Sequence, residues 1–126
     1  MPTLLIIEDA PNLLKWLLDA VRREVPGAEA MGATNGADAL AQLAQRSPGL
    51  IVLDLALPPG PTGGKPDPRV GLDILDRVAA LSPHPPVVVL SSMDMREETL
   101  RRGARAFISK DSSQMWPLLR EQLILA

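Results

Sequence analysis

The chain has 126 residues, 46% of them hydrophobic and 22% charged, which corresponds to one domain (residues 1–126) with room for a core. The formal net charge of −2 argues against a nucleic-acid or anionic-membrane surface, and without a membrane span or signal-peptide pattern we expect a soluble, cytoplasmic protein. The lack of cysteine and the single histidine, His84, exclude disulfides, thiolate catalysis and metal sites built from cysteines or several histidines.

Apolar runs alternate with segments of helical period along the chain. We predict strands at residues 4–7, 28–33, 50–53, 87–90 and 106–108. We predict helices at residues 11–25, 37–46 and 72–79, then from Asp94 to about Gly103, and from about Ser113 onward. The helical period is clearest in residues 11–25, where leucines and valines recur every three or four residues. Before the fourth predicted helix, Asp94 and Glu97 resemble a capping pair.

The pattern of strand followed by helix occurs five times, without a sequence repeat of fixed period. Strands that read as continuous apolar runs are typical of a parallel sheet that helices cover on both faces. Because crossovers are right-handed, we expect a doubly wound α/β sandwich with five strands and five helices. The chain ends with its last predicted helix, so we expect no output domain.

Polar side chains stand where four of the predicted strands end. In an open parallel sheet these ends meet at one edge, where ligands bind. Three carboxylates packed together repel one another unless a cation neutralises them, and hard oxygen ligands suit Mg²⁺. A hydroxyl and an ammonium beside them are suited to phosphoryl oxygens. The residues concerned are Glu8, Asp9, Asp54, Ser91 and Lys110.

Four short motifs in this order resemble those of the receiver domains of two-component response regulators. They are Leu-Ile-Ile-Glu8-Asp9, Ile-Val-Leu-Asp54-Leu-Ala-Leu-Pro58, Val-Val-Val-Leu-Ser91-Ser92 and Gly103-Ala-Arg-Ala-Phe107-Ile-Ser-Lys110. The likeness covers essentially the whole chain. Each motif alone is weakly specific, but four in the right order at the right strand ends are strongly specific. The resemblance implies the flavodoxin-like strand order 2-1-3-4-5.

The resemblance also implies a metal site and a phosphoacceptor. Glu8 and Asp9 look like the acidic pair that binds Mg²⁺, with Asp54 and the carbonyl of Ala56 as further ligands. Asp54 looks like the nucleophile that takes a phosphoryl group from a phosphohistidine on a sensor histidine kinase or a phosphotransfer protein. Such a protein is not an enzyme in the ordinary sense, since it catalyses only its own phosphorylation and dephosphorylation.

Three further residues receive roles from the same likeness. Ser91 and Lys110 would complete the catalytic set around the acids, and Ser91 and Phe107 would act as the switch. Phosphorylation would then change the surface of the fourth helix, fifth strand and fifth helix, and the protein would signal through contact with an unknown protein target. The alternatives for its assembly are a monomer and a phosphorylation-dependent homodimer.

The segment after the phosphoacceptor strand departs from the family. Residues 58–70 contain five prolines and three glycines, so we expect a long loop there, with an insertion at about residues 59–70. It begins beside Asp54, and four alternatives stay open. The alternatives are that the loop covers the site, that it shields the acyl phosphate, that it selects a partner, or that it is a surface loop without a role. A longer surface loop costs little entropy.

Other interpretations of the same residues are weaker. Taken singly, Asp54 could be a turn carboxylate and Phe107 an ordinary core aromatic. A phosphorylation-independent receiver-like interaction module is the main alternative, but it would be indicated by loss of the acids or the lysine, and both are present. A flavodoxin-type cofactor carrier needs a phosphate loop after the first strand, where Glu8 and Asp9 instead place negative charge. A Mg²⁺-dependent phosphohydrolase needs two alternating aspartates there, which the sequence lacks.

Overall fold

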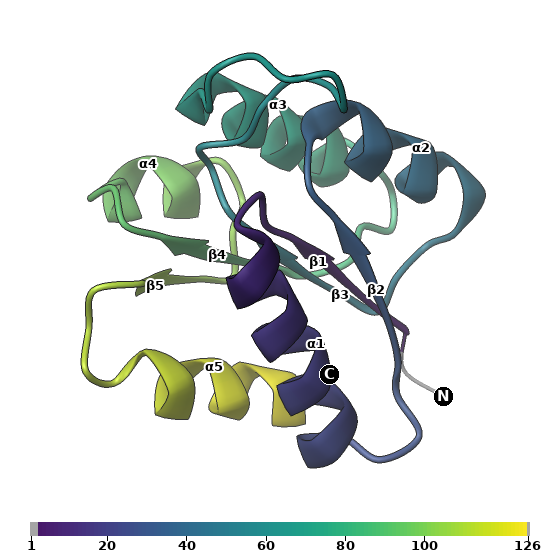
Figure 1. The fold of residues 1–126 in the computed structure, drawn as a ribbon, viewed down its shortest axis with the longest axis vertical. Helices are drawn as coiled ribbons and strands as arrows, with labels where there is room; N and C mark the ends of the chain where they lie inside the picture. The colour runs from purple at the N-terminus through teal and green to yellow at the C-terminus, as the bar shows by residue number, and fades with distance from the viewer. Residues whose placement is uncertain (1–2, 126) are drawn as a thin grey trace.

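The computed structural model describes residues 3–125, in which five strands alternate with five helices (Figure 1). The strands are β1 (Thr3–Ile7), β2 (Glu29–Ala33), β3 (Leu50–Leu53), β4 (Val87–Ser91) and β5 (Ala106–Ser109). The helices are α1 (Pro11–Glu24), α2 (Gly36–Gln45), α3 (Pro68–Ala79), α4 (Arg96–Arg101) and α5 (Met115–Ile124). The predicted alternation is confirmed. No helix within the described residues has the length and apolar character needed to cross a membrane.

The five strands form one parallel sheet in the order β2-β1-β3-β4-β5. This is the doubly wound, flavodoxin-like order that the family resemblance implies, so the expected fold class is confirmed. Ile7 pairs with both Ala33 and Leu53, Leu53 pairs with Val89, and Ser91 pairs with Ser109, so β4 and β5 run two residues beyond the ends of β1, β2 and β3. The polar residues at the strand ends therefore share one edge of the sheet.

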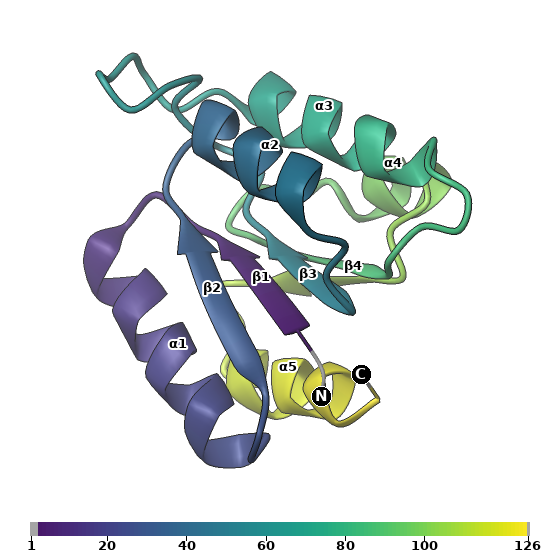
Figure 2. The ribbon, with the colours of Figure 1, turned by 90° about the vertical axis from the view of Figure 1, so that its right-hand side faces the viewer.

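Helices cover both faces of the sheet, α1 and α5 on one and α2, α3 and α4 on the other (Figures 1 and 2). Successive residues of β1 alternate between the two apolar cores. Leu5 and Ile7 belong to the core that also contains α3 residues, whereas Leu4 and Ile6 belong to the core shared with α1 and α5. Both faces of the strand are buried, which explains why the strands read as continuous apolar runs.

The start of α3 differs from the expectation. The density of proline predicts a loop through residue 70, but α3 begins at Pro68. Proline is well suited to the first helical position because the amide that it lacks would have no partner inside the helix. Asp67 caps the helix, and its carboxylate accepts a 2.9 Å hydrogen bond from the amide of Arg69. The loop therefore ends at Asp67, and the last proline of the segment starts a helix.

The cap predicted for the fourth helix is wrong. α4 is a short helix that begins at Arg96, and the residue before it, Met95, makes no side-chain cap. Asp94 lies outside the helix, because the chain bends after β4 and enters α4 two residues later. The first turn is held instead by Thr99, whose buried hydroxyl donates a 2.8 Å hydrogen bond to the carbonyl of Met95.

Gly71 brings α3 against the chain that leaves β3. Its amide donates a 3.0 Å hydrogen bond to the carbonyl of Leu55, the residue after Asp54. Leu55 and Leu57 are both fully buried. The segment that follows Asp54 is therefore fixed by packing before the irregular loop begins.

Candidate functional site

Three acidic side chains converge at the carboxyl edge of the sheet. Glu8 and Asp9 follow β1 and Asp54 follows β3, and each offers a carboxylate oxygen that lies within 4.8 Å of the others. Their backbone is held by extensions of the sheet ladder, since the amide of Asp54 donates to the carbonyl of Ile7 at 2.9 Å. Glu8 and Asp54 are buried and Asp9 is half-buried. The structure thus brings together the three acids expected to share a metal ion.

Lys110, the residue after β5, places its ammonium between two of these acids. Its Nζ lies 2.6 Å from Glu8 Oε1 and 3.0 Å from Asp54 Oδ2. The backbone of Lys110 is fixed by a 3.0 Å hydrogen bond from its amide to the carbonyl of Ser91. The Glu8 Oε1 atom is fully buried and has close ion-pair contact but no well-aligned hydrogen bond. One cation thus faces two buried carboxylates, with a third acid beside them.

For the two buried acids of this cluster, burial shifts the pKa more than pairing with Lys110 does. Burial raises the pKa of Glu8 to about 7, although the close contact with the Lys110 ammonium acts in the opposite direction. Burial likewise raises the pKa of Asp54, and the charge of Lys110 offsets only part of the effect. Burial disfavours the ammonium of Lys110, but Glu8 and Asp54 outweigh it and raise the pKa of the lysine. The cluster therefore has room for more positive charge than Lys110 supplies.

Ala56, the expected source of a carbonyl ligand, lies two residues beyond Asp54 and is half-buried. It lies between the buried Leu55 and Leu57, so its backbone belongs to the fixed part of the segment after β3.

Ser91 lies at the end of β4, next in the sheet to the end of β5. Its side chain is 1% exposed, and its hydroxyl oxygen accepts a 3.1 Å hydrogen bond from the amide of Met93. Phe107, on β5, is also buried and belongs to the core on the α3 side of the sheet. The guanidinium of Arg96 lies 5.2 Å from the centre of the Phe107 ring. This contact could not be read from the sequence, because an arginine at the start of a helix is typical of a solvated face.

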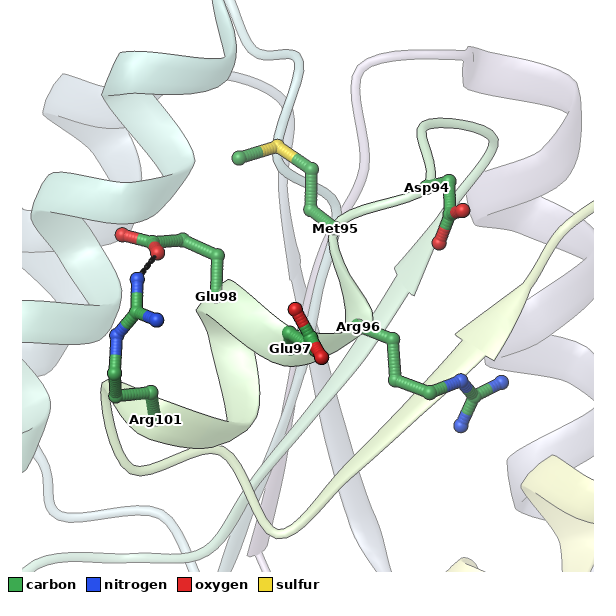
Figure 3. A pocket seen from close by; sticks show the side chains of 6 residues that line it. All are labelled: Asp94, Met95, Arg96, Glu97, Glu98 and Arg101. Atoms are coloured by element: carbon green, nitrogen blue, oxygen red, sulfur yellow. Dashed lines mark hydrogen bonds and ion pairs between the residues drawn. The ribbon is translucent and has the colours of Figure 1, made fainter.

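A pocket of about 560 Å³ lies along α4, away from the acids. Figure 3 shows Glu98 and Arg101 paired at one side of it, while Arg96 extends away from them. The residues that line it are Asp94, Met95, Arg96, Glu97, Glu98 and Arg101. A second pocket, of about 240 Å³, lies beside Asp9. His84 lies in the loop before β4, at the opposite end of the sheet from the acids, where the sequence places it.

Comparison with known proteins identifies one family. Residues 4–116 match the family described as the response regulator receiver domain. The chain is 29% identical over 126 residues to the probable transcriptional regulatory protein TcrX of Mycobacterium tuberculosis, covering 98% of this chain and 49% of TcrX. It is 26% identical over 110 residues to the chemotaxis protein CheY of Thermotoga maritima, covering 84% of this chain and 82% of CheY. The chain thus spans about half the length of the first relative and most of the second.

A solved structure shows the same fold. The crystal structure of the response regulator TrrA from Thermotoga maritima, in complex with Mg²⁺-BeF, superposes with a TM-score of 0.74. The alignment covers 98% of this chain and 99% of that one, with 21% sequence identity. At this identity the likeness concerns the fold.

Proposed function

The chain belongs to the response regulator receiver family, and from that premise we propose that Asp54 accepts a phosphoryl group in a Mg²⁺-dependent reaction. The observation that carries the proposal is the position of Lys110, whose ammonium bridges Glu8 and Asp54 within a cluster of three acids. A lysine that contacts the phosphoacceptor can also pair with the phosphoryl oxygens as they arrive. Residues 1–126 then act as a single receiver domain.

The donor set fits a hard divalent cation. Glu8, Asp9 and Asp54 offer carboxylate oxygens that lie close together, and the carbonyl of Ala56 is the proposed fourth ligand. The raised pKa of Glu8 and its poorly satisfied Oε1 atom indicate a site with too little positive charge. When bound, the cation supplies positive charge that offsets the repulsion between the anionic carboxylates and an anionic phosphoryl group. The complex of TrrA with Mg²⁺-BeF supports this choice of ion.

Asp54, Lys110 and Ser91 each have a separate role in the phosphoryl transfer. An oxygen of the Asp54 carboxylate attacks the phosphorus, and an O–P bond forms as the N–P bond of the phosphohistidine breaks. The electron pair of that bond leaves with the imidazole nitrogen of the donor. Lys110 keeps the carboxylate oriented and pairs with the phosphoryl oxygens, and Ser91 donates its hydroxyl to the acyl phosphate. These groups act by position and charge, as phosphoryl transfer requires.

The phosphoryl group then shifts the balance between two packings of one surface. Ser91 leaves its present contact with the amide of Met93, and Phe107 and the α4–β5–α5 surface rearrange with it. The donor is a sensor histidine kinase or a histidine phosphotransfer protein. The signal passes by contact with a protein target, with no nucleic acid bound by this domain.

Small phosphodonors test the proposal without a partner protein. The purified chain is incubated with acetyl phosphate in Mg²⁺ or in EDTA, and the intact mass is measured. We expect the wild type to gain one phosphoryl group in Mg²⁺ alone, and Asp54→Asn to gain none. Asp111→Asn is the matched control, because Asp111 is exposed beside Lys110 and outside the acid cluster. A wild type that gains no phosphoryl group in Mg²⁺ contradicts the proposal and favours a phosphorylation-independent interaction module.

A further inference from the structure

The loop between β3 and α3 is a hairpin with a fixed base. Leu57 and Asp67 form an antiparallel bridge in which each amide donates to the other's carbonyl, at 3.4 and 3.0 Å. A second bridge joins Gly60 to Gly63 and forms the turn at its tip. Leu57 is fully buried. Residues 58–66, called here the insertion hairpin, therefore leave and rejoin the domain at one point.

Two helices hold the hairpin in place. The carbonyls of Pro58 and Pro59 accept 2.9 Å hydrogen bonds from the amides of Gly36 and Ala37, the first two residues of α2. These amides would otherwise lack partners, since the first turn of a helix leaves its donors free. At the other end, Asp67 caps α3. These contacts fix the base of the hairpin at Pro58, Pro59 and Asp67.

The insertion hairpin lies beside the acid cluster. Asp9 and residues of the hairpin line the same pocket, of about 240 Å³. Gly60, Pro61 and Gly63 contribute from the hairpin, and Asn35 from the start of α2. Figure 2 shows the hairpin projecting beyond the carboxyl ends of the strands, past the first turns of α2 and α3. Any folded protein that reaches Asp54 approaches this same edge.

Whether a phosphodonor contacts the insertion hairpin depends on the size of the donor. A small phosphodonor needs only the acids and Lys110. A donor protein covers about 800 Å² of its partner in a standard interface, far more than the acid cluster occupies. Such a protein must rest on the surfaces that flank the site, and the projecting hairpin is one of them.

We propose that the insertion hairpin and the pocket beside Asp9 form a docking surface for the phosphodonor protein and determine which donor is accepted. This inference rests on the proposed function. Lys65 is the one charged residue of the hairpin, and the rest is proline, glycine and threonine. The matching patch on the donor, beside its phosphohistidine, is apolar with an acidic group placed to meet Lys65. The pocket receives a small apolar side chain of that patch between Pro61 and Pro11.

The experiment compares a protein donor with a small donor. The protein donor is the purified, phosphorylated histidine kinase that loads the wild type fastest among a panel of such kinases, and the small donor is acetyl phosphate. The main variant replaces residues 60–65 with one glycine, which keeps the carbonyls of Pro58 and Pro59 and the cap Asp67. Lys65→Glu reverses one charge without shortening the chain. Arg23→Glu is its control, since Arg23 is exposed in the last turn of α1 at the far edge of the sheet.

We expect the shortened variant to load from acetyl phosphate at the wild-type rate, while kcat/KM with the kinase falls about tenfold, mainly through KM. Lys65→Glu should lower kcat/KM with the kinase by about threefold, and less at high salt, because an exposed charge is screened. An unchanged kcat/KM with the kinase in the shortened variant overturns the docking role. Equal losses with both donors also overturn it, since the hairpin then supports the site itself. A wild type that acetyl phosphate cannot load at Asp54 refutes the proposed function instead, and the docking role with it.

Discussion

The close contact between α3 and the end of β3 gives a sharp test of the fold around the site. In Gly71→Ala, the new Cβ would lie 2.3 Å from the Cα of Leu55 and 2.5 Å from its carbonyl oxygen. Both are main-chain atoms next to Asp54, so no side-chain rotation relieves the overlap. Ordinary contact for a Cβ begins at 3.4 Å, which means that α3 must move outward by about 1 Å.

The cost follows from three contributions. Overpacking of this kind costs about 1–3 kcal/mol, and distortion of the Gly71 hydrogen bond to Leu55 adds about 1 kcal/mol. The preference of a helix for alanine over glycine returns about 0.5–1 kcal/mol. We therefore expect the free energy of unfolding to fall by about 1–3 kcal/mol, which lowers Tm by roughly 5–15 °C in a domain of this size.

Thermal unfolding followed by far-UV circular dichroism measures the effect. Gly49→Ala is the matched control, because a Cβ there lies 3.5 Å from its nearest neighbour, the carbonyl oxygen of Thr3. We expect this control to stay within about 0.5 kcal/mol of the wild type. If Gly71→Ala is as stable as Gly49→Ala, the close approach of α3 to Leu55 is refuted.

Three further predictions concern the site and its surroundings. Because burial raises the pKa of Glu8 from 4.5 to about 7, the free energy of unfolding of the metal-free protein should fall by up to about 3 kcal/mol as the pH rises between these two values. Urea unfolding in EDTA at pH 5 and pH 8 measures the loss, and an equal loss in Glu8→Gln contradicts the raised pKa of Glu8. Asn35→Ala removes the cap of α2, in which the Asn35 side chain accepts a 2.9 Å hydrogen bond from the amide of Asp38, and should lower the free energy of unfolding by about 1–2 kcal/mol; an unchanged thermal midpoint argues against the cap. Arg96→Ala should lower the free energy of unfolding by about 0.5–1 kcal/mol through loss of the contact with the Phe107 ring. A double-mutant cycle with Phe107→Leu that yields no coupling energy rules the contact out.

The sheet and the acid cluster could be predicted because each follows from a local rule. A strand buried on both faces must be apolar throughout, as Leu4–Ile7 is, and such strands indicate a parallel sheet. In a parallel sheet all strand ends meet at one edge, so reading the residue after each strand was sufficient to find Glu8, Asp54 and Lys110. The contacts of Lys110 with both acids followed from that placement.

The features that could not be predicted involve residues whose type fits two different structural roles, and the tertiary structure decides between them. Pro68 starts α3, although in sequence a proline is equally a helix breaker. Asp94 has the residue type and spacing of a cap, but the bend after β4 decides where α4 begins. The contact of Arg96 with Phe107 joins the first residue of α4 to a strand of the sheet, and only the tertiary packing brings them together.

The central claim is that Asp54 is the phosphoacceptor, and the residue that carries the phosphoryl group is the most direct test of it. After loading with acetyl phosphate in Mg²⁺, the protein is reduced with borohydride, which converts an aspartyl phosphate to homoserine, and is then mapped by peptide mass spectrometry. We expect homoserine at position 54 and nowhere else, and none when EDTA replaces Mg²⁺. Phosphate on Ser91, or homoserine at position 9 in place of position 54, would contradict the account.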